Sequence, residues 1–176
     1  EMVKTAAGNT VDVACDVHTR LDTTSAIRLA KDLEQFHLMW LEEPVPPENV
    51  AAMREVKRST TTPICAGENL YLRQGFRDLL ESQAVDIIMP DMAWCGGLSE
   101  TRKICHMAET YLLPVTSHDC TGPVALWSAA HLMLHIPNAK IVETVRAYYD
   151  GWYSEVMTEP IPIRDGMITL PGKPGL

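Results

Sequence analysis

The chain has 176 residues, 46% of them hydrophobic and 22% charged, and 23 acidic against 15 basic residues leave a formal net charge of −8. This composition is typical of one soluble globular domain. The acidic balance argues against a nucleic-acid partner, since such proteins present a basic surface to phosphates, and the apolar stretches are too short or too interrupted to cross a bilayer.

The first ten residues, EMVKTAAGNT, are typical of the end of a helix rather than of a signal peptide, and we expect the chain to be part of a larger domain. Six short apolar runs follow, and each ends in an acid or a histidine. The runs are VDVACD (11–16), LMWLE (38–42), PICAGE (63–68), VDIIMPD (85–91), LLPVTSH (112–118) and AKIVE (139–143). Runs of this length predict buried strands.

The linkers between these runs carry apolar residues at helical spacing. The helices that we expect are 23–36, with Asp22 or Thr23 as the N-cap, and 48–58, 72–81, 98–111 and 123–136. Alternating strands and helices indicate an α/β fold with a parallel sheet. No Gly-x-Gly-x-x-Gly follows the first strand, as a dinucleotide-binding sheet would require. A barrel needs eight strands, so two would be missing on the N-terminal side.

The polar residues that end the runs recur at intervals of 23 to 27 residues. They are Asp16, Glu42, Glu68, Asp91, His118 and Glu143. A repeat of this length with one strand per period indicates successive βα units. Parallel strands in such units place their carboxyl ends on one face, where βα barrels keep their catalytic residues. The interval therefore predicts that these six residues converge.

Three carboxylates, Asp16, Glu42 and Glu68, end consecutive strands. Neighbouring strands lie about 4.8 Å apart, so the three charges would repel one another unless a cation lay between them. Oxygen ligands favour Mg²⁺ over zinc or copper. The alternative is that one or two of these acids simply face solvent.

Asp91 and His118 end the next two strands. A carboxylate beside an imidazole orients the ring and raises its basicity, which suits a general base; the alternative is a histidine that only bonds the backbone. His18 lies just beyond the first strand, within reach of the same cavity, and Glu143 closes the set from the opposite side of the predicted ring.

Several short motifs resemble one known family. They are Asp16, Trp-Leu-Glu-Glu-Pro at 40–44, Ala-Gly-Glu-Asn at 66–69, Met-Pro-Asp at 89–91, Gly-Gly at 96–97 and Ser-His-Asp at 117–119. In order and spacing this set is similar to the mandelate racemase branch of the enolase superfamily. The resemblance implies an incomplete parallel (β/α) barrel of the modified TIM type, strands three to eight, without the N-terminal capping domain and the first strands.

The resemblance also implies roles for the polar residues. Asp16, Glu42 and Glu68 match the three Mg²⁺ ligands of that family. Asp91 and His118 match the dyad that removes the proton α to a carboxylate, and Glu143 matches the acid that hydrogen-bonds the substrate carboxylate. The family stabilises the resulting ene-diolate with Mg²⁺.

Asp16-Val17-His18 is similar to a finer signature, that of acid-sugar dehydratases such as galactonate and mannonate dehydratases. In these enzymes the histidine protonates the departing β-hydroxyl, and the product is a 2-keto-3-deoxy acid. The alternatives are a racemase, epimerase or cycloisomerase of hydroxy acids, in which His18 only ligates water or caps a loop, and a non-catalytic relative that binds a metabolite. The sequence does not name the sugar acid or its stereochemistry.

The chain departs from the family at residue 94. Relatives often carry a lysine there, three residues after Asp91, whereas this chain has Trp94, which excludes a lysine base on that strand. After Glu143, an arginine and three aromatic residues are open to interpretation. They are Arg146, which is a candidate for the substrate carboxylate, and Tyr148, Tyr149 and Trp152, which line the pocket or only pack.

We divide the chain into a partial barrel, 1–156, and an extended segment, 157–176, that packs on the barrel or on the missing capping domain. The segment is rich in proline, with Pro160, Pro162, Pro171 and Pro174, and a turn is expected at Asp165-Gly166. Five cysteines without a Cys-x-x-Cys pair indicate a reduced, cytoplasmic setting. We expect a homo-oligomer about twice as long per chain, and little solubility or activity for this part alone, because an open barrel exposes sheet edges.

Overall fold

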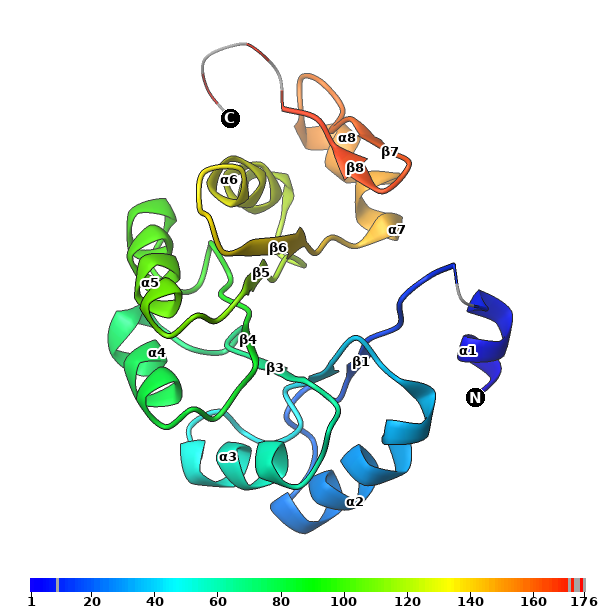
Figure 1. Ribbon diagram of the computed structural model, residues 1–176. Coiled ribbons are helices and arrows are strands. Elements are labelled where there is room, and N and C mark those ends of the chain that lie inside the picture. Colours follow the sequence, from blue (N-terminus) through cyan, green and yellow to red (C-terminus); the bar gives the residue numbers. More distant parts are fainter. Residues whose placement is uncertain (9, 171, 173–174, 176) are drawn as a thin grey trace. The chain divides into compact units, whose positions relative to one another are not determined.

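The computed structural model describes residues 1–8, 10–170, 172 and 175. They form two compact units, and each unit is built from two separate segments of the chain. The first unit comprises Glu1–Gly67 and Gln74–Ile88, and the second comprises Glu68–Arg73 and Met89–Leu176. Figure 1 traces the elements in chain order.

The first unit contains four short parallel strands that neighbour one another in sequence order. They are β1 (Cys15–Asp16), β2 (Leu41–Glu42), β3 (Ile64–Ala66) and β4 (Ile87–Ile88). Each lies inside one of the predicted apolar runs and is shorter than it. The side chains of β3 and Ile88 are fully buried, which explains why the runs are apolar rather than alternating.

The helix α1 (Met2–Ala7) precedes β1. The helices that follow the strands, as predicted, are α2 (Thr23–Leu33) with the 3₁₀ turn η1 (Glu34–Phe36), α3 (Val50–Arg58) and α4 (Leu72–Glu81), whose first two residues belong to the second unit. The carboxylate of Asp22 caps α2 by accepting from the Ser25 N–H at 2.9 Å. Asn49 caps α3 in the same way, accepting from the Ala52 N–H at 3.1 Å. This cap explains why α3 begins at residue 50 rather than at the predicted 48.

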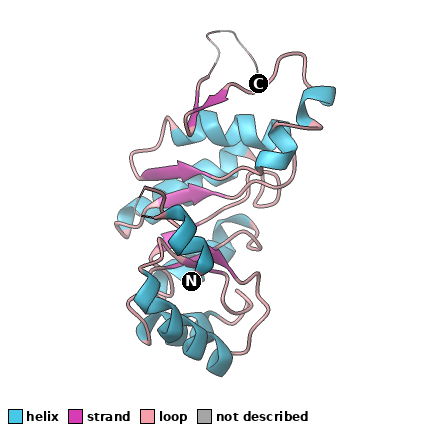
Figure 2. Ribbon diagram, turned by 90° about the vertical axis from the view of Figure 1, so that its right-hand side faces the viewer, coloured by secondary structure: helices cyan, strands magenta, loops and turns pink. Residues whose placement is uncertain are grey.

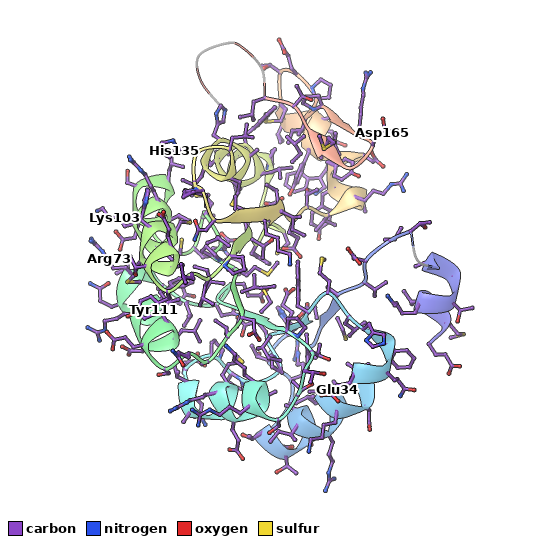
Figure 3. All side chains as sticks on the ribbon, viewed as in Figure 1. Glu34, Arg73, Lys103, Tyr111, His135 and Asp165 are labelled. Carbon is purple, nitrogen blue, oxygen red and sulfur yellow. The ribbon has the colours of Figure 1, made fainter. Side chains whose placement is uncertain are left out.

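The second unit contains the parallel pair β5 (Val115–Ser117) and β6 (Ala139–Val142) with the helices α5 (Leu98–Thr110) and α6 (Pro123–Met133). Most side chains of α6 are buried, in agreement with its apolar sequence. The helix ends three residues before the predicted residue 136, because the His135 N–H already bonds the Leu132 carbonyl at 2.8 Å and so tightens the last turn. On α4 and α5, Arg73 and Lys103 both form ion pairs with Glu100, at 2.9 and 3.6 Å (Figure 3).

The C-terminal part of the second unit holds two helices of four residues, α7 (Arg146–Tyr149) and α8 (Tyr153–Val156), and an antiparallel hairpin of β7 (Ile163–Arg164) and β8 (Met167–Ile168) (Figure 2). The predicted turn at Asp165-Gly166 is confirmed, since both residues have positive φ between the two strands. One-turn helices are too short for a 3.6-residue period to reveal, so the sequence did not predict them. Pro171 and Pro174, which we assigned to the extended segment 157–176, lie outside the described residues.

No helix in the described part of the chain is both long and apolar enough to span a bilayer.

Candidate active site

Asp91 and His118, which follow β4 and β5 along the chain, lie together in the second unit. The two residues form an isolated parallel bridge, and the N–H of His118 donates to the carbonyl of Pro90 at 3.2 Å. His118 Nδ1 lies 2.6 Å from Asp91 Oδ2, and both side chains are buried. The structure therefore brings the predicted histidine–aspartate pair into hydrogen-bond contact.

The second oxygen of Asp91 is held by the chain that follows it. Asp91 Oδ1 accepts hydrogen bonds from the backbone N–H groups of Ala93, at 2.7 Å, and Trp94, at 3.0 Å. A carboxylate only accepts, so the hydrogen of the short bond to Oδ2 belongs to His118 Nδ1. The other ring nitrogen, Nε2, is then the one available for proton transfer.

Two further carboxylates lie near His118 Nε2. Glu68 Oε2 is 3.4 Å away and Glu143 Oε2 is 3.9 Å away. Burial by itself lowers the pKa of His118, but the hydrogen bond to Asp91 and the negative charges of Glu143, Glu68 and Asp91 outweigh burial and raise this pKa to about 9. The indole of Trp94 lies beside the imidazole, with ring centroids 5.3 Å apart.

Glu143, which directly follows β6, is fixed through both its backbone and its side chain. Its N–H donates to the Ser117 carbonyl at 3.1 Å, and its Oε2 accepts from the Asp119 N–H at 3.0 Å. Burial raises the pKa of the Glu143 carboxyl, against the hydrogen bond from Asp119 and the charge of His118. A raised pKa favours a carboxyl that keeps its proton and can donate a hydrogen bond.

Asp16 and Glu42 lie side by side in the first unit, as register partners at the ends of β1 and β2. Glu42 is buried and accepts from the Trp40 indole N–H at 2.7 Å. Asp16 is exposed and accepts from the backbone N–H of His18 at 2.7 Å. His18 lies on the loop just beyond β1, as predicted, with its side chain 55% exposed and Nδ1 4.0 Å from Asp16 Oδ2.

The predicted metal ligands are divided between the units, with Asp16 and Glu42 in the first and Glu68 in the second. Among the described residues, no group of three or more His, Cys, Asp or Glu side chains is arranged to hold a metal ion. The assignment of these three acids as Mg²⁺ ligands therefore remains a prediction.

The structure also shows one buried acid that the sequence did not single out. Glu43 is fully buried, and its Oε1 accepts from the Gly67 N–H at 2.7 Å; the adjacent pair Glu42-Glu43 was the only signal. Arg146, a sequence candidate for the substrate carboxylate, is paired with Asp150 at 3.2 Å on the exposed face of α7. Trp152 packs on aromatic neighbours and also lines a cavity.

Comparison with known proteins shows the family of this chain. Residues 1–176 match the family described as Enolase C-terminal domain-like. The chain is 44% identical over 176 residues to a D-xylonate dehydratase of Haloferax volcanii, covering 100% of this chain and 42% of that protein. It is 32% identical over 179 residues to a D-galactonate dehydratase of Ralstonia pickettii, covering 99% and 47%.

Solved structures show the same fold. A mandelate racemase/muconate lactonizing enzyme-like protein of Rubrobacter xylanophilus is 44% identical with a TM-score of 0.89, over 96% of this chain and 43% of that one. An enolase protein from Sargasso Sea environmental sequencing is 38% identical with a TM-score of 0.92, over 98% and 46%. The predicted fold class, an incomplete (β/α) barrel of the modified TIM type, is confirmed. The chain spans less than half the length of these relatives.

Proposed function

Because this chain belongs to the enolase C-terminal domain-like family, we propose that it supplies the catalytic residues for dehydration of a sugar acid. The observation that carries the proposal is the buried His118–Asp91 pair, in which His118 Nε2 lies near the carboxylates of Glu143 and Glu68. The relatives named as D-xylonate and D-galactonate dehydratases support an aldonate as the substrate.

His118 is the proposed base that takes the proton α to the substrate carboxylate. Asp91 holds its ring with Nε2 toward the substrate, and the fixed geometry lowers the barrier by avoiding reorientation during the reaction. Glu143, whose pKa is raised by burial, is the proposed hydrogen-bond donor to the substrate carboxylate as negative charge builds there.

Asp16, Glu42 and Glu68 are the proposed Mg²⁺ ligands. The donor set fits this ion by its chemistry, because it consists only of carboxylate oxygens and Mg²⁺ is a hard cation that prefers them. When bound, Mg²⁺ would stabilise the charge on the substrate carboxylate and offset the negative charges around His118.

His18 is the proposed acid for the second half of the reaction. The C–H bond at C2 breaks and its proton passes to His118. The C–O bond at C3 then breaks, and the hydroxyl leaves as water with a proton from His18. The resulting enol becomes the 2-keto-3-deoxy acid. The exposed position of His18 on the loop beyond β1 supports this role, since the acid must reach substrate rather than pack in the core.

A panel of aldonic and aldaric acids with Mg²⁺, scored for 2-keto-3-deoxy products, tests the proposal on the protein that contains this chain. We expect His118→Asn to abolish both dehydration and exchange of the α-proton with solvent deuterium. We expect His18→Asn to abolish dehydration but retain the exchange. The matched control is His106→Asn on α5, where the exposed His106 pairs with Glu109 at 3.3 Å.

Four outcomes would contradict parts of this proposal. Full turnover by His118→Asn would exclude His118 as the base. Normal dehydration by His18→Asn would exclude its acid role. Exchange without any dehydration in the unsubstituted protein would favour a racemase or epimerase, and neither exchange nor dehydration would favour a non-catalytic relative that binds a metabolite.

The proposal also covers the cellular location and the partners of the protein. All five cysteines are free thiols, which suits the reducing cytoplasm. A small sugar acid is the proposed partner, and we expect a homo-oligomer.

A further inference from the structure

Asp119, the residue after His118, is fully buried and has no role in the reaction proposed above. Its backbone N–H donates to Glu143 Oε2 at 3.0 Å. Its carboxylate Oδ2 accepts from Thr144 Oγ1 at 3.4 Å. With the bond from the Glu143 N–H to the Ser117 carbonyl, these contacts fasten the segment 117–119 to residues 143–144.

Tyr153 contacts the same carboxylate from a distant part of the chain. Its side chain is 1% exposed, and its hydroxyl donates to Asp119 Oδ2 at 3.4 Å. Burial, and then the charge of Asp119, raise the pKa of Tyr153, so the phenol keeps the proton that it donates. The two bonds to Oδ2 are long, and each is weaker than a bond at 2.8 Å; loss of either one leaves a buried carboxylate oxygen poorly solvated.

The position of Tyr153 is in turn fixed by its neighbours on α7 and α8. The Trp152 ring meets the Tyr153 ring edge-on, with centroids 4.6 Å apart, and the Tyr148 ring lies 6.0 Å away. Gly151 joins the two helices, and a Cβ there would lie 2.7 Å from the Ala147 carbonyl oxygen. The contacts with Trp152 and Tyr148 therefore hold the Tyr153 hydroxyl in one position.

We infer that Tyr153 and Asp119 are positioning residues that set the Glu143 carboxyl against His118 Nε2. Tyr153 holds the Asp119 carboxylate, the Asp119 backbone places its N–H on Glu143 Oε2, and Glu143 faces the imidazole at 3.9 Å. The inference rests on the proposed function, because it assigns Glu143 and His118 to the reaction. Neither Tyr153 nor Asp119 needs to touch substrate.

The test compares Tyr153→Phe and Thr144→Val, which each remove one donor to Asp119, with Tyr149→Phe. Tyr149 lies on the same short helix as Tyr148, and no hydrogen bond of its hydroxyl is found within the described ranges. A misplaced Glu143 weakens the transition state more than substrate binding, so we expect Tyr153→Phe to lower kcat about 10-fold while KM changes less than about twofold. We expect Thr144→Val to act in the same direction and Tyr149→Phe to match the unsubstituted protein.

A second measurement does not depend on turnover. Amide hydrogen–deuterium exchange of the 117–122 segment reports whether the Asp119 N–H is held on Glu143. We expect this segment to exchange faster in Tyr153→Phe than in the unsubstituted protein and in Tyr149→Phe. This result would support the coupling even if the protein dehydrated no sugar acid, a finding that would contradict the proposed function alone.

Two results would overturn the inference. One is an active protein in which Tyr153→Phe leaves both kcat and the exchange of 117–122 unchanged. The other is a loss of rate that disappears once rates are normalised to the folded fraction measured by circular dichroism, because Tyr153 would then act only on stability.

Discussion

The two units hold their candidate catalytic residues in opposite ways. In the first unit the side chains of Asp16 and His18 are 51% and 55% exposed. In the second unit those of Asp91 and His118 are 0% and 7% exposed and share a bond of 2.6 Å. A buried polar group must be hydrogen-bonded by the fold itself, whereas an exposed one is solvated by water. The Asp91–His118 pair is thus held by hydrogen bonds within the fold, whereas the side chains of Asp16 and His18 are more than half exposed.

The largest expected effect concerns the hydrogen-bonded pair of Asp91 and His118. In Asp91→Asn, the amide oxygen would take the bonds from Ala93 and Trp94, and the NH₂ group would face His118 Nδ1. The ring would then carry its hydrogen on Nε2 and could not accept a proton, so we expect kcat to fall about 10³- to 10⁴-fold. Steady-state kinetics with the exposed Asp78→Asn as the control measure this. A loss below tenfold would show that Asp91 does not set the tautomer.

Magnesium tests whether Asp16 and Glu42 act together with Glu68 as ligands of one ion. A ligand that binds only the folded protein stabilises it by about 2.7 kcal/mol at 100 times its Kd. We expect thermal unfolding to show such a gain with Mg²⁺, its loss with a chelator, and no gain in Asp16→Asn or Glu68→Gln. The surface variant Glu81→Gln should respond like the unsubstituted protein. A full gain in Asp16→Asn would remove Asp16 from the ligand set.

Glu42, the buried acid of the first unit, allows the contribution of its hydrogen bond to stability to be measured. Trp40→Phe removes the indole N–H that Glu42 accepts, and loss of a partner to a buried carboxylate costs about 1–3 kcal/mol. Trp94→Phe is the matched control, because Trp94 donates to Asp91 through its backbone and is 39% exposed. Urea denaturation should show the larger loss for Trp40→Phe. Equal losses would mean that ring packing, not the hydrogen bond, accounts for the effect.

The smallest effect concerns Glu34 on the outer surface of the first unit (Figure 3). Hydrogen bonds from the Thr61 N–H and then the Thr60 hydroxyl lower the pKa of Glu34 below its ordinary value of 4.5. A lowered folded pKa adds stability above pH 4.5 that is lost as the pH falls through the folded value. We therefore expect Glu34→Gln to lower the urea midpoint slightly at pH 7, and the difference to vanish well below pH 4. A difference that persists in acid would contradict this origin.

Local patterns predicted most of the fold. The helix over 72–81 begins and ends at the predicted residues, and Asp22 caps α2 as expected, because capping and helical periodicity depend on neighbours within a few residues. Strand ends were less predictable. Only Leu41 and Glu42 of the run 38–42 form β2, since pairing depends on the neighbouring strands and not on the run itself.

Within the site, spacing and resemblance were enough to select the polar residues and the Asp91–His118 pair, but not the partners of the residues that follow Glu143. The sequence by itself determined the order of βα units, the family, and the pairing of Asp91 with His118, because parallel strands carry the residues at their carboxyl ends to one edge. Only the tertiary structure decided that Arg146 pairs with Asp150 and that Tyr153 reaches Asp119. Such contacts depend on where one-turn helices pack, and four residues carry no periodic signal from which that packing can be read.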